Sequence, residues 1–151
     1  MTKDLILSEN PDEGILRLTL NSPETQNTLS REMIEALIKE FTEVKHNKSI
    51  RVILLAAHGP VFCAGHNLKE MKEAQINPES GKLFLKALFD SCSSLMQLIV
   101  NHPKPVIAIV DGVATAAGCQ LVASCDLAYA SDSARFATPG VNIGLFCSTP
   151  M

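Results

Sequence analysis

The sequence predicts an α/β protein whose strands form a largely parallel sheet. Two short apolar runs, residues 51–57 and 106–110, are continuous instead of alternating, as expected for strands that are buried on both faces. Apolar residues recur at helical spacing over residues 30–47 and again over residues 79–101. Because strands that alternate with helices imply βαβ crossovers, we expect most neighbouring strands to be parallel.

The remaining elements extend this pattern at both ends of the chain. Residues 4–9 and 14–20 are predicted to be strands of an opening hairpin, and Ser30 is placed to cap the helix that follows. Residues 126–131 are predicted to form a third strand after the two apolar runs. The last segment, RFATPGVNIGLFCSTPM, begins a further unit without a cap or a polar tail, so we expect one domain that is truncated on its C-terminal side.

Composition favours a compact intracellular domain and gives no signal for nucleic-acid binding. The chain has 151 residues, enough for one domain, and 46% are hydrophobic. The net charge is −3, with no basic run, no Trp and one Tyr, so the usual signals for nucleic-acid binding are absent. No uninterrupted apolar run reaches the roughly 18 residues of a membrane helix. The five cysteines and an opening without a signal-peptide pattern indicate free thiols in a reducing compartment.

Two loops share one local pattern, in which a buried strand leads through small residues to the start of a helix. They are FCAGHNL, residues 62–68, and DGVATAAGCQL, residues 111–121. Small residues let the backbone approach a ligand closely, and the first N–H groups of a helix have no partner within it. Two such N–H groups that converge would form an oxyanion hole for a thioester carbonyl oxygen. On spacing alone, tight packing of strand on helix remains the favoured explanation.

Other kinds of site lack their full pattern. The second loop has no Lys-Ser/Thr after its glycine, as a nucleotide P-loop would require, and no dinucleotide fingerprint follows a strand. Cys63 with His66, or Cys119 with Cys125, lacks a matching second pair of metal ligands, so these cysteines are better explained as small buried residues. Ser148 lacks the G-x-S-x-G sequence of a hydrolase nucleophile.

Five ordered motifs resemble those of the crotonase (enoyl-CoA hydratase/isomerase) superfamily and cover nearly the whole chain. They are SPETQNTL with Pro23, Asn27 and Leu29, then FCAGHNL, PVIAIVDG, AAGCQLVASCDLAYA and FATPGVNIG. The resemblance implies a crotonase-like spiral of ββα units, with no cofactor apart from a coenzyme A thioester as substrate or ligand. It also implies a homotrimer or hexamer, built partly by helices beyond residue 151, in the mitochondrial matrix of a eukaryote or otherwise in the cytoplasm.

The same resemblance implies an acyl-CoA site with the thioester oxygen held by the backbone N–H groups of His66 and Ala117. The residues that would line this site come from three loops and are Asn27, Ala64, Gly65, His66, Asn67, Leu68, Lys69 and Ala117. Ala117 stands where the family usually has Gly, which is tolerable if its φ is negative. Asn67 stands where Asp is usual and keeps a hydrogen-bonding side chain in the loop.

The two glutamates of the family's hydratases are missing. The resemblance places their positions at Gln120 and Gly140, and a further position used by isomerases and dehalogenases at Ser148. Hydration needs one group that takes a proton from water and one that protonates the α-carbon, which neither an amide nor a glycine can do. We therefore expect an acyl-CoA-binding protein of fatty-acid metabolism without ordinary hydratase activity. An enzyme with isomerase- or hydrolase-type chemistry on an acyl-CoA, and a non-catalytic partner subunit, are the alternatives.

Overall fold

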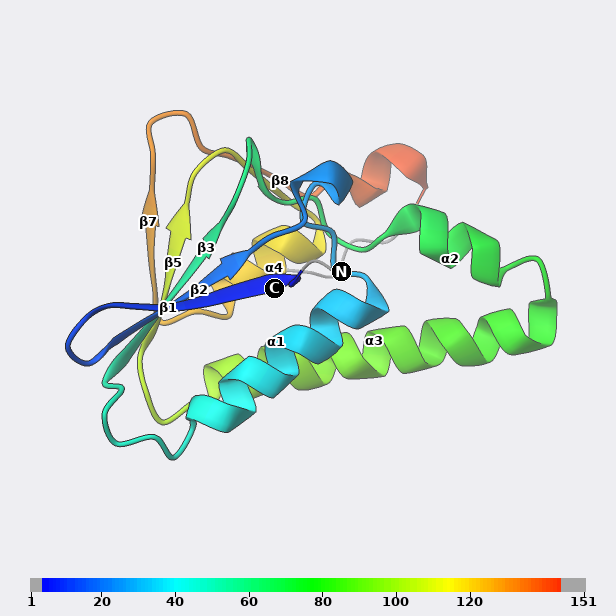
Figure 1. Cartoon of the computed structure of the whole chain (residues 1–151). Coiled ribbons are helices and arrows are strands. Elements are labelled where there is room, and N and C mark those ends of the chain that lie inside the picture. Colours follow the sequence, from blue (N-terminus) through cyan, green and yellow to red (C-terminus); the bar gives the residue numbers. More distant parts are fainter. Residues whose placement is uncertain (1–3, 145–151) are drawn as a thin grey trace.

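The computed structural model describes residues 4–144, which form two β-sheets and four α-helices (Figure 1). The larger sheet has the strand order β1-β2-β3-β5-β7, and the smaller sheet has the order β4-β6-β8. The strands of the larger sheet are β1 (Ile6–Asp12), β2 (Ile15–Leu20), β3 (Val52–Ala57), β5 (Val106–Val110) and β7 (Leu127–Ala130). The strands of the smaller sheet are β4 (Val61–Cys63), β6 (Val113–Thr115) and β8 (Arg135–Ala137). The helices are α1 (Arg31–Val44), α2 (Leu68–Ala74), α3 (Pro78–Val100) and α4 (Ala117–Ala123), with short 3-10 turns η1 (Pro23–Thr25) and η2 (Pro139–Ile143).

The strand pairing confirms the predicted α/β class. β1 and β2 form the predicted antiparallel hairpin, and the other pairs of neighbouring strands in the described part of the chain are parallel. Each of β3, β5 and β7 in the larger sheet is followed by a short strand of the smaller sheet. A helix or the turn η2 comes next, so the chain repeats a ββα unit.

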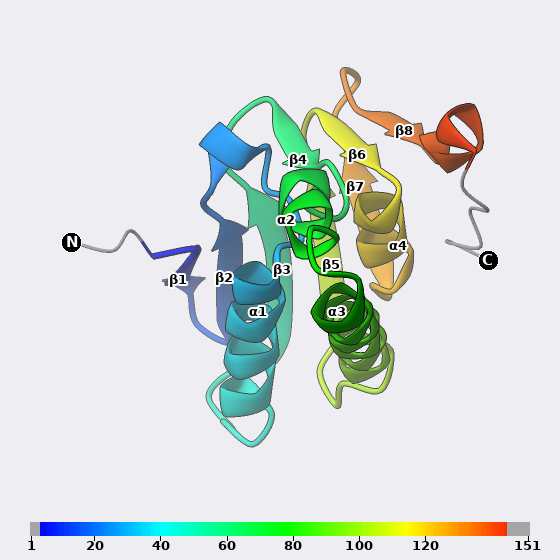
Figure 2. The same cartoon turned by 90° about the vertical axis from the view of Figure 1, so that its right-hand side faces the viewer.

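A single apolar core lies between the larger sheet and the helices α1 and α3, which lie side by side on one of its faces (Figure 2). The predicted cap of α1 is confirmed, because the Ser30 hydroxyl accepts a hydrogen bond of 3.2 Å from the Met33 N–H. The side chains that α1 buries are Met33, Ile34, Leu37 and Phe41. Those that α3 buries among the large residues are Leu88, Leu95, Met96 and Ile99. The apolar stripes seen in the sequence therefore face the sheet, as helical periodicity predicts.

Helix α3 corrects one expectation drawn from the apolar runs. Over residues 4–144 it is the one helix that is long and apolar enough to cross a membrane, judged by length and composition only. The few charged residues of α3 interrupt every long apolar run, but the helix is still apolar on average. A search for uninterrupted apolar runs therefore did not identify it as a possible membrane span. A core helix of a soluble protein passes the same test, and α3 packs against α1 and buries its apolar stripe in the core.

The flank formed by β7, β8 and η2 differs from the rest of the molecule. Both sheets end on this side, and every residue of β7 and β8 is exposed. Large apolar side chains are exposed here, with 55% of Leu127, 65% of Tyr129 and 51% of Phe136 accessible.

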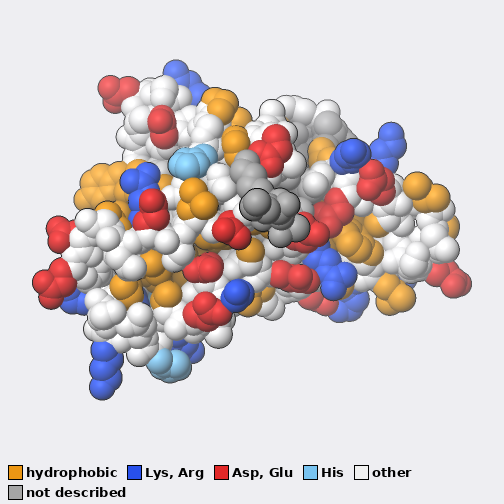
Figure 3. All heavy atoms as spheres, viewed as in Figure 1, with side chains coloured by type: hydrophobic (Ala, Val, Ile, Leu, Met, Phe, Trp, Pro, Cys, Tyr) orange, Lys and Arg blue, Asp and Glu red, His pale blue; other side chains and the backbone are white. Residues whose placement is uncertain are grey.

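On the face seen in Figure 3, acidic and basic side chains are interspersed among apolar ones. That face has no broad single-sign area of the kind that nucleic acid would require.

Candidate functional site

The tertiary structure brings together the two loops that the sequence singled out. β4 and β6, which precede them, are parallel neighbours in the smaller sheet. The Thr115 hydroxyl donates a hydrogen bond of 3.1 Å to the Ala64 carbonyl oxygen, which joins the two loops directly. A Cβ atom built on Gly65 would lie only 3.3 Å from the backbone nitrogen of Ala117 and 3.0 Å from the Ala116 Cβ. Residues 51 positions apart in the sequence, Ala64 and Thr115, thus meet at the expected oxyanion loops.

The two expected donors are left free while the backbone groups around them are bonded. The Leu29 N–H donates to the Gly65 carbonyl at 2.8 Å, and the Ala116 N–H donates to the Ala137 carbonyl at 2.9 Å. Within residues 4–144, neither the His66 N–H nor the Ala117 N–H donates to a backbone or side-chain acceptor. Free N–H groups on rigidly held backbone are what an oxyanion hole requires.

Backbone strain in these loops falls on Ala116 and not on Ala117. Ala117 is the first residue of α4 and is not among the residues with positive φ, so the condition set for replacing Gly there is met. Ala116 has φ 50° and ψ −121°, a conformation that glycine adopts readily and an L-residue adopts only with strain. In the first loop the positive φ, 86°, falls on Gly65, where it costs little.

Asn27 holds the SPETQNTL loop in place and is fully buried. Its side-chain oxygen accepts from the Ser22 N–H, and its amide group donates to the carbonyl oxygens of His58 and Val61, all at 2.8 Å. The loop in turn reaches the first oxyanion loop, because the Ala64 N–H donates to the Gln26 carbonyl at 3.2 Å. With no exposed surface, Asn27 positions this loop, and the structure does not place it for the direct ligand contact that the sequence analysis expected.

Asn67 begins helix α2 and has a capping role. Its side-chain oxygen accepts from the N–H groups of Lys69 and Glu70, both at 3.2 Å. Leu68 and Lys69 are exposed next to it, and Ala64 is half-buried, so these predicted lining residues remain accessible. The Asn that replaces the family's usual Asp thus keeps the acceptor that α2 needs.

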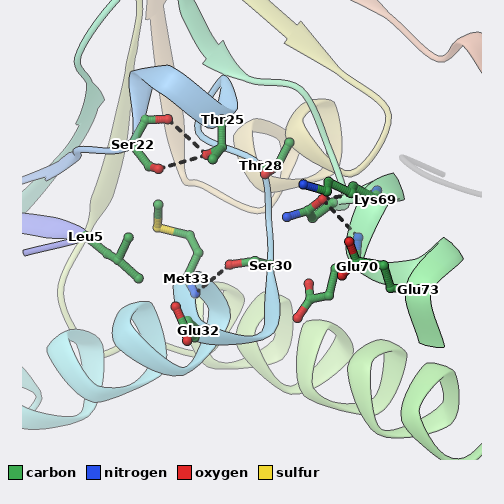
Figure 4. A pocket seen from close by; sticks show the side chains of 11 residues that line it. Leu5, Ser22, Thr25, Thr28, Ser30, Glu32, Met33, Lys69, Glu70 and Glu73 are labelled. Carbon is green, nitrogen blue, oxygen red and sulfur yellow. Dashed lines mark hydrogen bonds between the residues drawn. The ribbon is translucent and has the colours of Figure 1, made fainter. Parts of the chain in front are cut away.

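A pocket of about 350 Å³ lies between η1, the start of α1 and α2, and two of the predicted site residues, Asn67 and Lys69, line it. Its lining residues are Leu5, Ser22, Thr25, Thr28, Ser30, Glu32, Met33, Asn67, Lys69, Glu70 and Glu73. Figure 4 shows the Ser and Thr side chains on one side and the Lys and Glu side chains of α2 on the other. Since a hydroxyl is a common surface group, no sequence pattern could have revealed that four of them line one hollow.

The His66 side chain lies in an apolar setting beside the loop. Its ring packs edge-on against Phe89 of α3, with 5.2 Å between the ring centroids and 74° between the planes. Its Nε2 atom is buried and makes no hydrogen bond within the described part of the chain. Burial lowers the pKa of His66 below its ordinary value of 6.5, so the imidazole is neutral at pH 7.

The two positions that the resemblance assigns to the hydratase glutamates carry no carboxylate side chain. Gln120 lies on α4 three residues after Ala117, half-buried, and Gly140 lies in η2. Ser148 lies outside the described residues. Cys63 offers no nucleophile in exchange, because burial raises the pKa of its thiol to about 12. Over residues 4–144 no group of three or more His, Cys, Asp or Glu side chains is arranged to hold a metal ion.

These features define a crotonase-type fold in which the loops of His66 and Ala117 lie against each other. Residues 10–150 match the family Enoyl-CoA hydratase/isomerase, and the chain belongs to that family. Over 145 residues it is 48% identical to the mitochondrial enoyl-CoA hydratase domain-containing protein 3 of Mus musculus, covering 96% of this chain and 47% of that protein. It is 32% identical over 142 residues to 2,3-dehydroadipyl-CoA hydratase of Escherichia coli (strain K12), covering 94% of this chain and 52% of that protein.

A solved structure agrees with the sequence comparison. The crystal structure of human enoyl Coenzyme A hydratase domain-containing protein 3 superimposes with a TM-score of 0.88 at 48% identity, over 97% of this chain and 56% of that chain. The chain therefore spans about half the length of the relatives that it matches.

Proposed function

We propose that this chain binds acyl-CoA thioesters of fatty-acid metabolism through the N–H groups of His66 and Ala117, without ordinary hydratase activity. The observation that carries the proposal is the pair of free donors on loops that approach to 3.3 Å, measured from a Cβ built on Gly65 to the Ala117 nitrogen. The named activity of the Escherichia coli relative, a CoA-ester hydratase, supports the class of ligand. Since Gln120 and Gly140 occupy the glutamate positions, binding is proposed in place of hydration.

Binding can be tested with ligands that differ only at the carbonyl. Isothermal titration calorimetry would compare butyryl-CoA with S-butyl-CoA, a thioether of the same chain length that lacks the carbonyl oxygen. Two hydrogen bonds of about 1 kcal/mol each predict that the thioester binds roughly tenfold or more tightly. Equal affinities would contradict a role for the two N–H groups, and no binding of either ligand would refute the proposed function.

Turnover needs a separate assay with crotonyl-CoA, followed as loss of the enoyl-thioester absorbance at high protein concentration. Each general acid or base contributes about 10²–10⁴-fold, so losing both predicts a rate at least about 10⁴-fold below that of an authentic hydratase. Turnover within tenfold of that control would refute the assignment of Gln120 and Gly140.

A second proposal, favoured by the exposed strands β7 and β8, is that the chain acts as a subunit of a crotonase-type assembly, a trimer or hexamer. Leu127, Tyr129 and Phe136 would lie in contacts with the rest of such an assembly. Analytical ultracentrifugation of the chain would test it, and a monomer at every concentration would contradict self-assembly. The mitochondrial names of close relatives support a mitochondrial location if the source is a eukaryote.

A further inference from the structure

The His66 side chain has a feature that neither the fold nor the oxyanion role explains. Only its backbone N–H is needed to hold a thioester oxygen, yet its imidazole lies next to Phe89 with Nε2 buried and without a hydrogen-bond partner among residues 4–144. A buried polar atom without a partner costs about 1–3 kcal/mol. An apolar side chain at this position would fill the same space without that cost.

The surroundings of the ring make it a neutral hydrogen-bonding group. Burial is the one cause of its lowered pKa, and no charged side chain contributes to the shift. A neutral imidazole has one nitrogen that donates and one that accepts, and either can serve a ligand oxygen that carries a proton. In a water-poor setting such a hydrogen bond is stronger than on the surface.

Position on the chain limits what the ring can contact. The imidazole and the donor N–H belong to the same residue, so they are separated by no more than the length of one histidine side chain. If the thioester oxygen is held by that N–H, an oxygen within reach of Nε2 must lie within a few bonds of the thioester, which on the acyl side means the first carbons of the acyl chain. A polar group farther along the chain would lie beyond the ring.

We propose that the His66 imidazole hydrogen-bonds to an oxygen on the α- or β-carbon of the bound acyl group. The site then prefers acyl-CoA thioesters with a hydroxyl group at that point over unsubstituted ones. This inference rests on the proposed function, because it needs a thioester held at the His66 N–H. A site with a buried group that awaits a hydrogen bond rejects ligands that cannot supply the bond.

The test compares 3-hydroxybutyryl-CoA with butyryl-CoA by calorimetry, on the wild-type chain and on His66→Phe and His66→Gln. Wild type is expected to bind the hydroxylated ligand about tenfold more tightly, as one satisfied buried hydrogen bond predicts. Phe keeps a ring against Phe89 and the backbone N–H but cannot hydrogen-bond, so the affinity ratio should fall to about one or below. Gln keeps a polar group of similar reach and should restore part of the preference.

The outcomes separate this inference from the proposed function. If wild type binds both ligands and the ratio is the same in His66→Phe, the inference is overturned and acyl-CoA binding stands. If the preference disappears in His66→Phe and partly returns in His66→Gln, the inference is supported, whatever the absolute affinities. If neither ligand binds wild type, both the inference and the proposed function are refuted. Thermal unfolding of each variant establishes that the chain is folded before its ratio is interpreted.

Discussion

The two loops that carry the expected oxyanion donors share a pattern but differ in how they are held. In the loop of His66 the positive φ falls on Gly65, and the loop is bonded to the buried segment around Asn27. In the loop of Ala117 the positive φ falls on Ala116, whose N–H is bonded to Ala137 of the exposed strand β8. The first donor therefore lies on relaxed backbone supported by the core, and the second on strained backbone supported from the surface.

This difference predicts how substitutions in each loop affect stability. A strained conformation persists only when its surroundings over-determine it, at a cost of about 1–3 kcal/mol. For Ala116 those surroundings include β8, together with the Cys119 thiol, which contacts the Ala114 and Ala137 carbonyl oxygens at 2.9 and 3.3 Å. Changes at the second loop should thus alter strain, whereas changes at the first should alter packing and buried hydrogen bonds.

The largest expected effect is at Gly118, where the two loops touch most closely. An added Cβ there would meet the carbonyl oxygen of Cys63 and lie 3.0 Å from its Cβ. Gly118→Ala is expected to destabilise the fold by about 3 kcal/mol, since backbone cannot move aside as a side chain does. Urea unfolding followed by circular dichroism would measure it, with Ala123→Ser on the exposed side of α4 as control. A loss below about 1 kcal/mol would show that the loops can separate.

The next effect concerns the support of the first loop. Asn27→Ala removes the partner of three backbone groups, the buried Ser22 N–H and the part-buried carbonyl oxygens of His58 and Val61. We expect a loss of about 2–3 kcal/mol in unfolding free energy. Asn21→Ala, which removes two exposed hydrogen bonds, one to the Asp4 carbonyl and one to the His58 ring, should cost less than about 1 kcal/mol in the same experiment. Equal losses would mean that the first loop does not depend on Asn27.

Gly65→Ala tests the relaxed backbone of the first loop directly. Alanine at position 65 would have to adopt φ near 86°, and its Cβ would lie 3.0 Å from the Ala116 Cβ. We therefore expect the free energy of unfolding to fall by about 2 kcal/mol. Because Ala116→Gly removes one of the two atoms in this contact, the double variant should lose less than the sum of the single changes. Strict additivity in urea unfolding would contradict the contact between the loops.

Ala116→Gly alone should stabilise the protein. It relieves the strain at φ 50°, ψ −121°, and the gain is offset in part by the greater chain entropy of glycine when unfolded. We expect about 0.5–1 kcal/mol of added stability, seen as a higher midpoint of urea unfolding. Ala117→Gly is the matched control and should destabilise, because it places glycine inside a helix without relieving strain.

The smallest effect is the pH dependence that His66 adds to stability. Its folded-state pKa lies below the unfolded value of 6.5, so the unfolded chain binds the proton first as pH falls. Stability should be unaffected by this group above that pH and should decrease below it, until the folded form is protonated as well. The difference in unfolding free energy between wild type and His66→Phe, measured from pH 8 down to pH 5, should therefore shift against wild type. A constant difference would contradict burial of the ring.

Sequence patterns were sufficient to predict those structural elements that depend only on residues close together in the chain. The apolar runs that became β3 and β5, the hairpin, and the Ser30 cap of α1 depend on neighbouring residues, so they could be predicted. The strands β4, β6 and β8 have three residues each, too few to show a period of two, and they were not distinguished from loops. Of the pocket beside α2, the sequence indicated Asn67 and Lys69 but not the four hydroxyl side chains, because the lining comes from separate segments.

The sequence by itself determined the fold class, the family motifs and the absence of glutamates at positions 120 and 140, because these depend only on residue identity and order. Only the tertiary structure decided that the loops of His66 and Ala117 meet, that both N–H groups have no acceptor among residues 4–144, and that the strain lies on Ala116. It alone placed the imidazole of His66 against Phe89 with its Nε2 unpaired. The physical reason is that approach, burial and hydrogen bonding arise between segments far apart in the chain, which local periodicity cannot encode.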